Sequence, residues 1–143
     1  MKIKQTIDHE QFLRILTNSW AVLTLFIFWL DFYSLGKYDQ LASPVGIIYV
    51  GILSIYAGEK EFDRWQKHHK SRFRGEMFVL IWTISITFMA ISSIITKGYL
   101  SLPKDTASIY TGILAIFAIS QKSKSLFREK LKEDYQNKAE NTK

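Results

Sequence analysis

The feature that most constrains the fold is a run of 20 residues, Met77 to Thr96, that contains no Asp, Glu, Lys, Arg or His. As a helix, a run of this length rises about 30 Å and crosses the hydrocarbon layer of a bilayer. A surface helix of a soluble bundle would carry charges on its outer face every turn or two. Charged residues make up 22% of the chain, but they are segregated away from this run. We therefore predict an integral membrane protein and not a soluble one.

Apolar segments predict an all-α, polytopic fold with four transmembrane helices in a single membrane domain, residues 1–143. The first segment has no small-residue cleavage site close behind it, so we interpret it as an uncleaved span and not as a signal peptide. Ser43 and Pro44 are typical of a helix N-cap followed by the first helical position, and they predict the start of the second span. The expected spans cover about 15–35, 44–58, 77–96 and 104–121.

The second and fourth segments have short uncharged cores. They cross the bilayer if flanking lysines such as Lys60, Lys104 and Lys122 reach the headgroups, or if the bilayer thins locally. The alternative is that these two segments form re-entrant hairpins.

Lysine and arginine are distributed unevenly around the expected spans. Three precede the first span, six lie between the second and third, and seven follow the fourth, whereas the two remaining loops share three. Because loops rich in Lys and Arg stay in the cytoplasm, we expect both termini and the 59–74 loop to face the cytoplasm, with the protein in a bacterial plasma (inner) membrane. The net charge of +6 then suits an anionic inner leaflet better than a nucleic acid. The expected contacts with lipid headgroups are Trp65, Arg72, Arg74, Lys122, Lys124 and Arg128.

An internal repeat relates the second and fourth segments. Residues 38–57 align without gaps onto residues 99–118, and nine of the twenty positions are identical. The repeat predicts two tandem related hairpins, about 15–65 and 77–130, which a pseudo-axis along the membrane normal would relate. Small residues let helices in lipid pack closely. The candidates for such helix packing are Gly51, Ser54, Gly58, Ser108, Gly112 and Ala115.

Apart from Asp105 at the edge of the fourth, Asp31 is the one carboxylate inside an expected span, and intramembrane carboxylates often mark ion or proton paths. Its place near a helix end, beside Trp29 and Tyr33, favours an interfacial residue with Lys37 as a partner. Small multidrug exporters also have four short helices and an acidic residue in the first, but the strong charge bias argues against the dual insertion seen in some of them.

Thr83 and Thr87 lie four residues apart on one face of the third span. They could line a polar path, although hydrogen bonds to their own helix or to a neighbouring one are the favoured interpretation. Together with Asp31, these two threonines are the candidates for an ion or transport site.

A charged and aromatic segment follows the second span. Glu61 is expected to pair with Arg64, three residues later on a helix. With Tyr56, Lys60, Glu61, Arg64 and Trp65, the segment resembles small four-pass bacterial membrane proteins of uncharacterised function that carry a Tyr-x-x-x-Lys-Glu-x-x-Arg-Trp juxtamembrane segment. The resemblance is confined to these residues and implies no activity.

The C-terminal segment, residues 122–143, is expected to be a cytoplasmic amphipathic tail. Phe127, Leu131 and Tyr135 recur at helical spacing among basic residues, a pattern that suits a helix lying on an anionic leaflet. We expect disorder beyond Gln136.

Catalytic motifs are missing from the sequence. Without cysteine there is no thiol nucleophile, disulfide or Cys-ligated metal site, and His9, His68 and His69 lack further ligands at a suitable spacing. No P-loop, nucleophile elbow or HExxH motif occurs. We therefore expect no enzyme, no cofactor and no metal.

The leading hypothesis is a membrane protein that assembles with itself or with a larger membrane complex. The alternative is a small pore or transporter, holin-like or small exporter-like.

Overall fold

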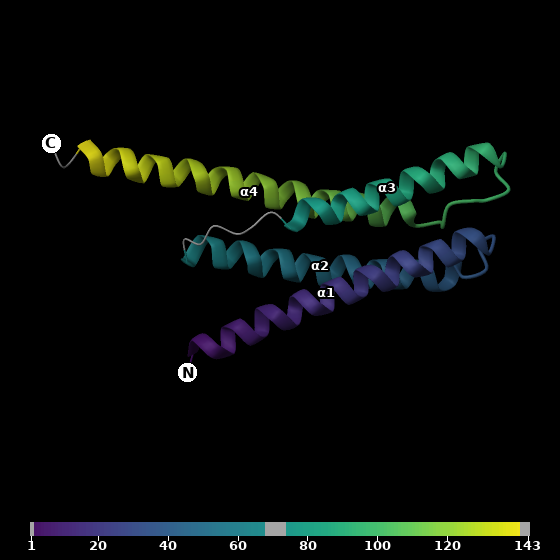
Figure 1. Ribbon diagram of the computed structural model, residues 1–143, viewed down its shortest axis with the longest axis horizontal. Helices are drawn as coiled ribbons and strands as arrows, with labels where there is room; N and C mark the ends of the chain where they lie inside the picture. Colours follow the sequence, from purple (N-terminus) through teal and green to yellow (C-terminus); the bar gives the residue numbers. More distant parts are fainter. Residues whose placement is uncertain (1, 68–73, 141–143) are drawn as a thin grey trace.

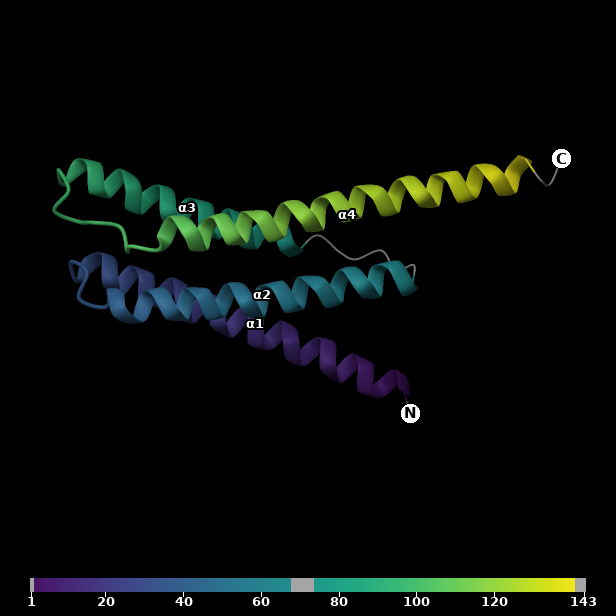
Figure 2. The same ribbon diagram turned by 180° about the vertical axis from the view of Figure 1, so that it is seen from behind.

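The computed structural model describes residues 2–67 and 74–140, with side chains described for 11–66 and 77–138. Four α-helices form: α1 (Lys2–Tyr33), α2 (Asp39–Lys67), α3 (Arg74–Ile95) and α4 (Thr106–Glu140). They lie side by side along one long axis (Figures 1 and 2). The start of α1 and the end of α4 share one end of the bundle, and the α1–α2 and α3–α4 connections lie at the other (Figure 1). The predicted all-α architecture is confirmed.

Three of these helices are long and apolar enough to cross a membrane, over Gln11–Tyr33, Asp39–Gln66 and Met77–Ile95. Large apolar side chains are exposed along them; Ile84, for example, is 66% exposed. Helices that are apolar on their outer faces are suited to a lipid environment. The structure therefore supports a multi-pass helical membrane protein. α4 is not among the three, since its apolar part ends at Lys122, and a fourth crossing stays a prediction.

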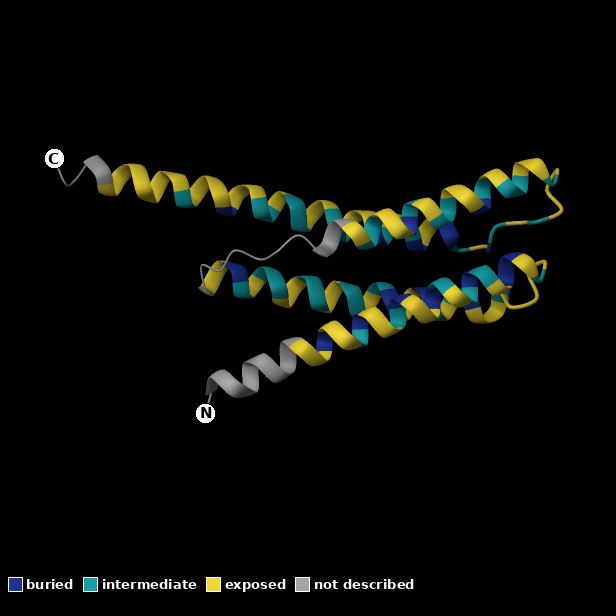
Figure 3. Ribbon diagram, viewed as in Figure 1, coloured by how far each residue is buried: buried dark blue, intermediate teal, exposed yellow. Residues whose placement is uncertain are grey.

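The helices pack as a bundle in which α2 has the central position. α1 packs along α2, and α4 packs against α2 and less extensively against α3. Aromatic rings fill the interior: Trp82 makes an edge-on contact with Phe28 at 5.8 Å between ring centroids and stacks on Tyr49 at 5.7 Å. Such pairs add to the stability gained from burying the rings. Buried residues gather mainly in the half of the bundle nearest the two connections (Figure 3).

The same backbone turn ends α1 and α3. The Gly36 N–H donates to the Asp31 carbonyl at 3.0 Å, and the Gly98 N–H donates to the Ser93 carbonyl at 2.9 Å. Both glycines have positive φ angles, 80° and 82°, which a residue without Cβ adopts at little cost. These two turns reverse the chain, so that α2 lies alongside α1 and α4 lies alongside α3.

The expected helix start at Ser43 and Pro44 is wrong, because α2 begins upstream at Asp39 and contains Pro44. The backbone N–H groups of Leu41 and Ala42 donate to the Tyr38 carbonyl at 2.8 and 2.9 Å, so the first turn forms before the proline. Pro44 then removes one hydrogen bond early in the helix without preventing that turn.

The C-terminal segment is also different from the expectation. α4 continues without a break to Glu140, so the predicted disorder beyond Gln136 is wrong for residues 137–140; residues 141–143 lie outside the described part. Phe127 is 6% exposed and packs against Trp65 of α2, with ring centroids 5.5 Å apart. Phe127 was expected to face lipid, but it packs against another helix of the same chain. Without Gly or Pro in 121–140, nothing in the sequence interrupts the helix.

Candidate functional site

The predicted helix-packing residues have two different positions. A Cβ atom added to Gly112 would lie 3.1 Å from Val50 Cγ1 of α2, so Gly112 belongs to an interhelical contact. Added Cβ atoms at Gly51 and Gly58 would meet nothing within 4 Å. Ser54, Ser108 and Ala115 are exposed as well. The α2–α4 contact thus includes Gly112, and the other five residues lie on the surface.

A glycine that the sequence reasoning missed completes this contact, which we call the α2–α4 seam and define by Gly46, Val50, Ile109 and Gly112. Gly46 is buried, and a Cβ there would overlap Ile109 Cδ1 and lie 3.4 Å from Phe28 Cζ. In the internal repeat Gly46 is aligned with Ala107, so the identical positions did not reveal it.

The five surface residues lie together on one outer face. Each helical residue is rotated by about 100° from the one before it. On α2, the buried Tyr49 lies on one side of Val50, and Ser54 and Gly51 lie on the other. On α4, the buried Ile113 lies on one side of Gly112, and Ala115 lies on the other. Because α2 and α4 run in the same direction (Figures 1 and 2), both sets flank the seam on the same surface. This small-residue face comprises Gly51, Ser54, Gly58, Ser108 and Ala115.

Asp31 points into the bundle. It is 1% exposed, so the bundle covers its side chain, and its position at the membrane interface stays a prediction. Asp31 Oδ1 accepts a hydrogen bond from the Tyr38 N–H at 2.7 Å, which links the end of α1 to the connection with α2. Lys37 is exposed and forms no ion pair with Asp31. The side chain thus orders the α1–α2 connection from inside the protein.

Polar contacts join the two hairpins at the end that carries their connections. The Lys104 Nζ lies 2.8 Å from Asp39 Oδ2, and the Lys104 backbone N–H donates to Asp39 Oδ1 at 3.2 Å. The Ser43 hydroxyl donates to the Asp105 carboxylate. The hydrogen bond and charge of Asp39 raise the pKa of Lys104. The Lys104 side chain is 84% exposed, so the ion pair contributes little to stability.

Four buried polar side-chain atoms lack a partner among the described residues, and each helix contributes one. They are Asp31 Oδ2 of α1, Tyr49 Oη of α2, Trp82 Nε1 of α3 and Thr106 Oγ1 of α4. Buried polar atoms in proteins are nearly always hydrogen-bonded to protein or water. The sequence offered no signal for Tyr49, Trp82 or Thr106, since each residue type also occurs in ordinary apolar cores.

The two threonines predicted for a polar path have different surroundings. Thr83 Oγ1 donates to the Val79 carbonyl at 2.8 Å and lies 2.8 Å from the Tyr110 hydroxyl of α4. Thr87 is exposed on α3. Thr83 therefore satisfies its hydroxyl within α3 and also links α3 to α4.

Contacts between α2 and α4 continue at the end where α4 projects. The Trp65 indole N–H donates to Ser123 Oγ at 3.1 Å, and Lys130 Nζ lies 5.6 Å from the Trp65 ring centroid. The predicted pair of Glu61 and Arg64 is confirmed, with Nη1 and Oε2 2.5 Å apart.

The remaining predicted headgroup contacts are distributed around this end. Trp65 is 40% exposed, Lys122 and Arg128 are exposed, and Lys124 is half-buried. Arg74 is the first residue of α3, and Arg72 lies outside the described residues, as do His68 and His69.

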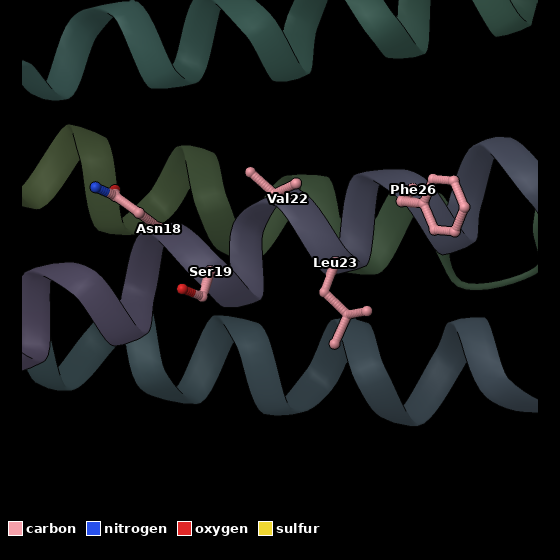
Figure 4. A pocket seen from close by; sticks show the side chains of 5 residues that line it. All are labelled: Asn18, Ser19, Val22, Leu23 and Phe26. Carbon is pink, nitrogen blue, oxygen red and sulfur yellow. The ribbon is translucent and has the colours of Figure 1, made fainter.

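A shallow hollow lies on the outer face of α1. Figure 4 shows the five side chains that line it, all from α1: Asn18, Ser19, Val22, Leu23 and Phe26. Every one of them is exposed, and the lining is mainly apolar. Such an open surface offers none of the convergent polar groups that orient a small ligand.

Comparisons with known proteins give no further assignment. No model of a protein family matches the chain, and no curated protein or solved structure matches it. Among the described residues no group of three or more His, Cys, Asp or Glu side chains could hold a metal ion. The class supported by the fold is a helical, multi-pass membrane protein.

Proposed function

We propose that the chain is a non-enzymatic protein of a bacterial inner membrane that acts by assembling with a second copy of itself or within a larger membrane complex. The observation that carries this proposal is the exposed small-residue face. Added Cβ atoms at Gly51 and Gly58 would meet no atom of the chain within 4 Å, so another helix could approach the α2 backbone closely there. Close approach through small residues is a main source of helix association in lipid.

The outer face of α3 supplies the contrast. Its exposed residues include Ile84, Ile91 and Ile94, which are 66%, 51% and 77% exposed. Large aliphatic side chains are well accommodated by lipid tails, whereas the small-residue face leaves a shallow surface that a helix fills better than lipid does. The Ser54 hydroxyl donates to the Val50 carbonyl of its own helix at 2.8 Å, so placing it against an apolar partner leaves no unsatisfied donor.

A second copy is the simplest partner. Two copies in one membrane keep the same orientation when a twofold axis lies along the membrane normal, and such an axis brings the same face of both copies together. In the proposed topology all four helices cross, and the termini face the cytoplasm. Exposed basic residues such as Lys122 and Arg128 then contact an anionic inner leaflet.

Disulfide cross-linking tests this proposal directly, because the natural chain contains no cysteine. Single variants Ser54→Cys and Ala115→Cys place a thiol on the small-residue face, and Ile84→Cys places one on the exposed face of α3. We expect oxidation in native membranes to give covalent dimers for Ser54→Cys, for Ala115→Cys or for both, and not for Ile84→Cys. Equal cross-linking at all three positions, or at none, would contradict assembly of copies through this face.

A bulky substitution extends the test. Adding Gly51→Leu to Ser54→Cys should reduce dimer formation by about tenfold, since overpacking a close contact costs about 1–3 kcal/mol. Thr87→Leu on α3 is the matched control, because it also enlarges an exposed small side chain but lies away from the face. If the Gly51→Leu variant loses self-association and also fails to co-purify a membrane partner, the face serves both forms of assembly.

A small pore or transporter is the second candidate, and the burial of Asp31 inside the bundle favours it. Reconstituted liposomes would show flux of protons or small solutes that Asp31→Asn abolishes. Cross-linking through the small-residue face without any flux would support assembly over transport.

A further inference from the structure

The four unpartnered polar atoms lie on interior side chains of all four helices. Asp31, Tyr49, Trp82 and Thr106 are 1%, 0%, 1% and 3% exposed, and each has one polar side-chain atom without a partner in the described structure. Burying such an atom in an apolar interior without a hydrogen-bond partner is energetically unfavourable, because the atom loses its hydrogen bonds to water. Every helix thus contributes one unpartnered interior atom, and the rings of Tyr49 and Trp82 are in direct contact.

Helix geometry places Asp31 and Thr106 on the connection side of one shared layer of the bundle. A Cβ on Gly46 would contact both Phe28 of α1 and Ile109 of α4, so these two side chains share one layer. Asp31 and Thr106 each lie three residues from that layer toward the connections, which is about 4.5 Å along a helix axis. Tyr49 and Trp82 occupy the next part of the interior, where Trp82 also contacts Phe28.

We propose that these residues form a buried proton-binding site centred on the Asp31 carboxyl. Asp31 Oδ1 is committed to the Tyr38 N–H at 2.7 Å, and Oδ2 is the atom that takes the proton. A hydronium ion delivers the proton: its O–H bond breaks as the bond to Oδ2 forms, so the carboxylate becomes a carboxylic acid and one water molecule is released. The Thr106 hydroxyl suits both states, because it donates to a carboxylate and accepts from a carboxylic acid by rotating its O–H.

The other two atoms favour a proton over a metal cation. The Trp82 N–H can only donate, and hydroxyls such as Tyr49 Oη both donate and accept. The Trp82 ring stacks on Tyr49, and in the proposed site buried water connects their polar atoms to Thr106 and Asp31. A cation would need several convergent oxygen ligands, whereas the site has one carboxyl group, and the described residues contain no group of three or more His, Cys, Asp or Glu that could hold a metal ion.

The charged neighbours of the site lie on the side of the connections. Asp39 at the start of α2 and Lys104 before α4 form an ion pair, and Asp105 accepts a hydrogen bond from Ser43. The face of α3 turned toward the site contributes Trp82, which does not titrate. Protons therefore reach Asp31 from the end of the bundle that carries the hairpin connections. The site is independent of assembly, since all its groups belong to one chain.

Infrared difference spectroscopy of the full chain in detergent micelles tests the proposal. We expect the carbonyl band of a protonated carboxylic acid to appear as the pH is lowered and one such component to be lost in Asp31→Asn. Asp134→Asn removes an exposed carboxyl near the end of α4 and should keep that component. Identical pH series for the wild type and Asp31→Asn, or an Asp31 carboxyl that holds one protonation state throughout, would overturn the proposal.

The hydroxyls provide a second measurement that does not depend on the folding of Asp31→Asn. Thr106→Val removes the hydroxyl and keeps the shape, so it should shift the midpoint of the Asp31 band by about tenfold in proton concentration, the effect of one hydrogen bond to a charged group. Thr106→Ser should leave the midpoint close to that of the wild type. Tyr49→Phe should produce a smaller shift. If Thr106→Val and Tyr49→Phe both leave the midpoint unchanged, the hydroxyls are not part of a proton site.

Discussion

At the scale of single residues, glycines of the same helix have opposite roles. Gly46 lies in the α2–α4 seam, where an added Cβ would overlap Ile109 Cδ1, whereas an added Cβ at Gly51 would meet nothing within 4 Å. The first glycine permits packing within one chain, and we propose that the second permits packing between chains. The difference depends on which side of α2 each residue occupies.

The contrast between these glycines predicts different effects of the same substitution. Gly46→Leu should lower the free energy of unfolding by about 1–3 kcal/mol, because the added atoms overpack the seam. Gly51→Leu should lower the free energy of unfolding of the monomer by less than about 0.5 kcal/mol. Equilibrium unfolding in detergent, followed by circular dichroism, measures both. Equal losses of stability in the two variants would contradict the described seam.

The ion pair of Lys104 and Asp39 predicts a weak dependence on pH and salt. Because Asp39 raises the pKa of Lys104 above its ordinary value of 10.5, the pair stabilises the fold below that pH. This contribution is lost as the pH rises through the raised pKa. Lys104→Gln should therefore be slightly less stable than the wild type at neutral pH, and the difference should disappear at strongly alkaline pH. High salt should reduce the stability difference between Lys104→Gln and the wild type at neutral pH. If this difference persists at high salt, Lys104 has a role other than the ion pair.

At the scale of secondary structure, an aromatic contact with α2 helps to hold the projecting part of α4, beside the hydrogen bond of Trp65 to Ser123. Phe127 is 6% exposed and packs against Trp65, whereas Tyr135, two turns further on, is 74% exposed. Of the apolar residues that recur at helical spacing, the first, Phe127, therefore packs against α2, and the last, Tyr135, is exposed.

Hydrogen exchange should report this difference along α4. Phe127→Ala removes burial worth about 2 kcal/mol, so amides in residues 122–131 should exchange at least about tenfold faster than in the wild type. Tyr135→Ala is the matched control and should leave the exchange of those amides unchanged. An equal effect of the two substitutions would mean that Trp65 does not hold the helix.

At the scale of the whole molecule, the direction of the chain through the bundle connects structure and topology. The start of α1 and the end of α4 lie at one end, and both hairpin connections lie at the other (Figure 1). If all four helices cross, the end of the bundle with the two termini and the end with the two connections lie on opposite sides of a membrane. With three crossings, Ser125 in α4 and Ser101 before α4 would share one side.

Labelling single cysteines in intact cells with an impermeant maleimide distinguishes these topologies. Ser125 and Ser101 are both exposed, so the two cysteine variants are matched in accessibility. We expect Ser101→Cys to react from outside and Ser125→Cys to react only after lysis, because the basic segments stay in the cytoplasm. Labelling of both positions from the same side would contradict the fourth crossing.

The sequence by itself determined the helical class and three apolar segments long enough to cross a membrane. The segment at 77–96 was the clearest, because an uncharged run of about 20 residues has few physical alternatives to a membrane helix. It also predicted the pair of Glu61 and Arg64, since the geometry of one helix sets that contact. Helix starts were less predictable: Ser43 and Pro44 carried a local start signal, but the turn at Gly36 began α2 earlier.

Only the tertiary structure decided which side chains face inward. The rotation of α1 buries Asp31, and the approach of α2 to α4 makes Gly46 a contact residue while leaving Gly51 on the surface. Likewise, the pairing of hairpins brings Asp39 to Lys104 across a long stretch of sequence. In a membrane protein apolar residues cover both the lipid-facing and the interior surfaces, so hydrophobic periodicity does not reveal the orientation of a helix. Contacts between helices fix that orientation, and they depend on the shapes of all four helices together.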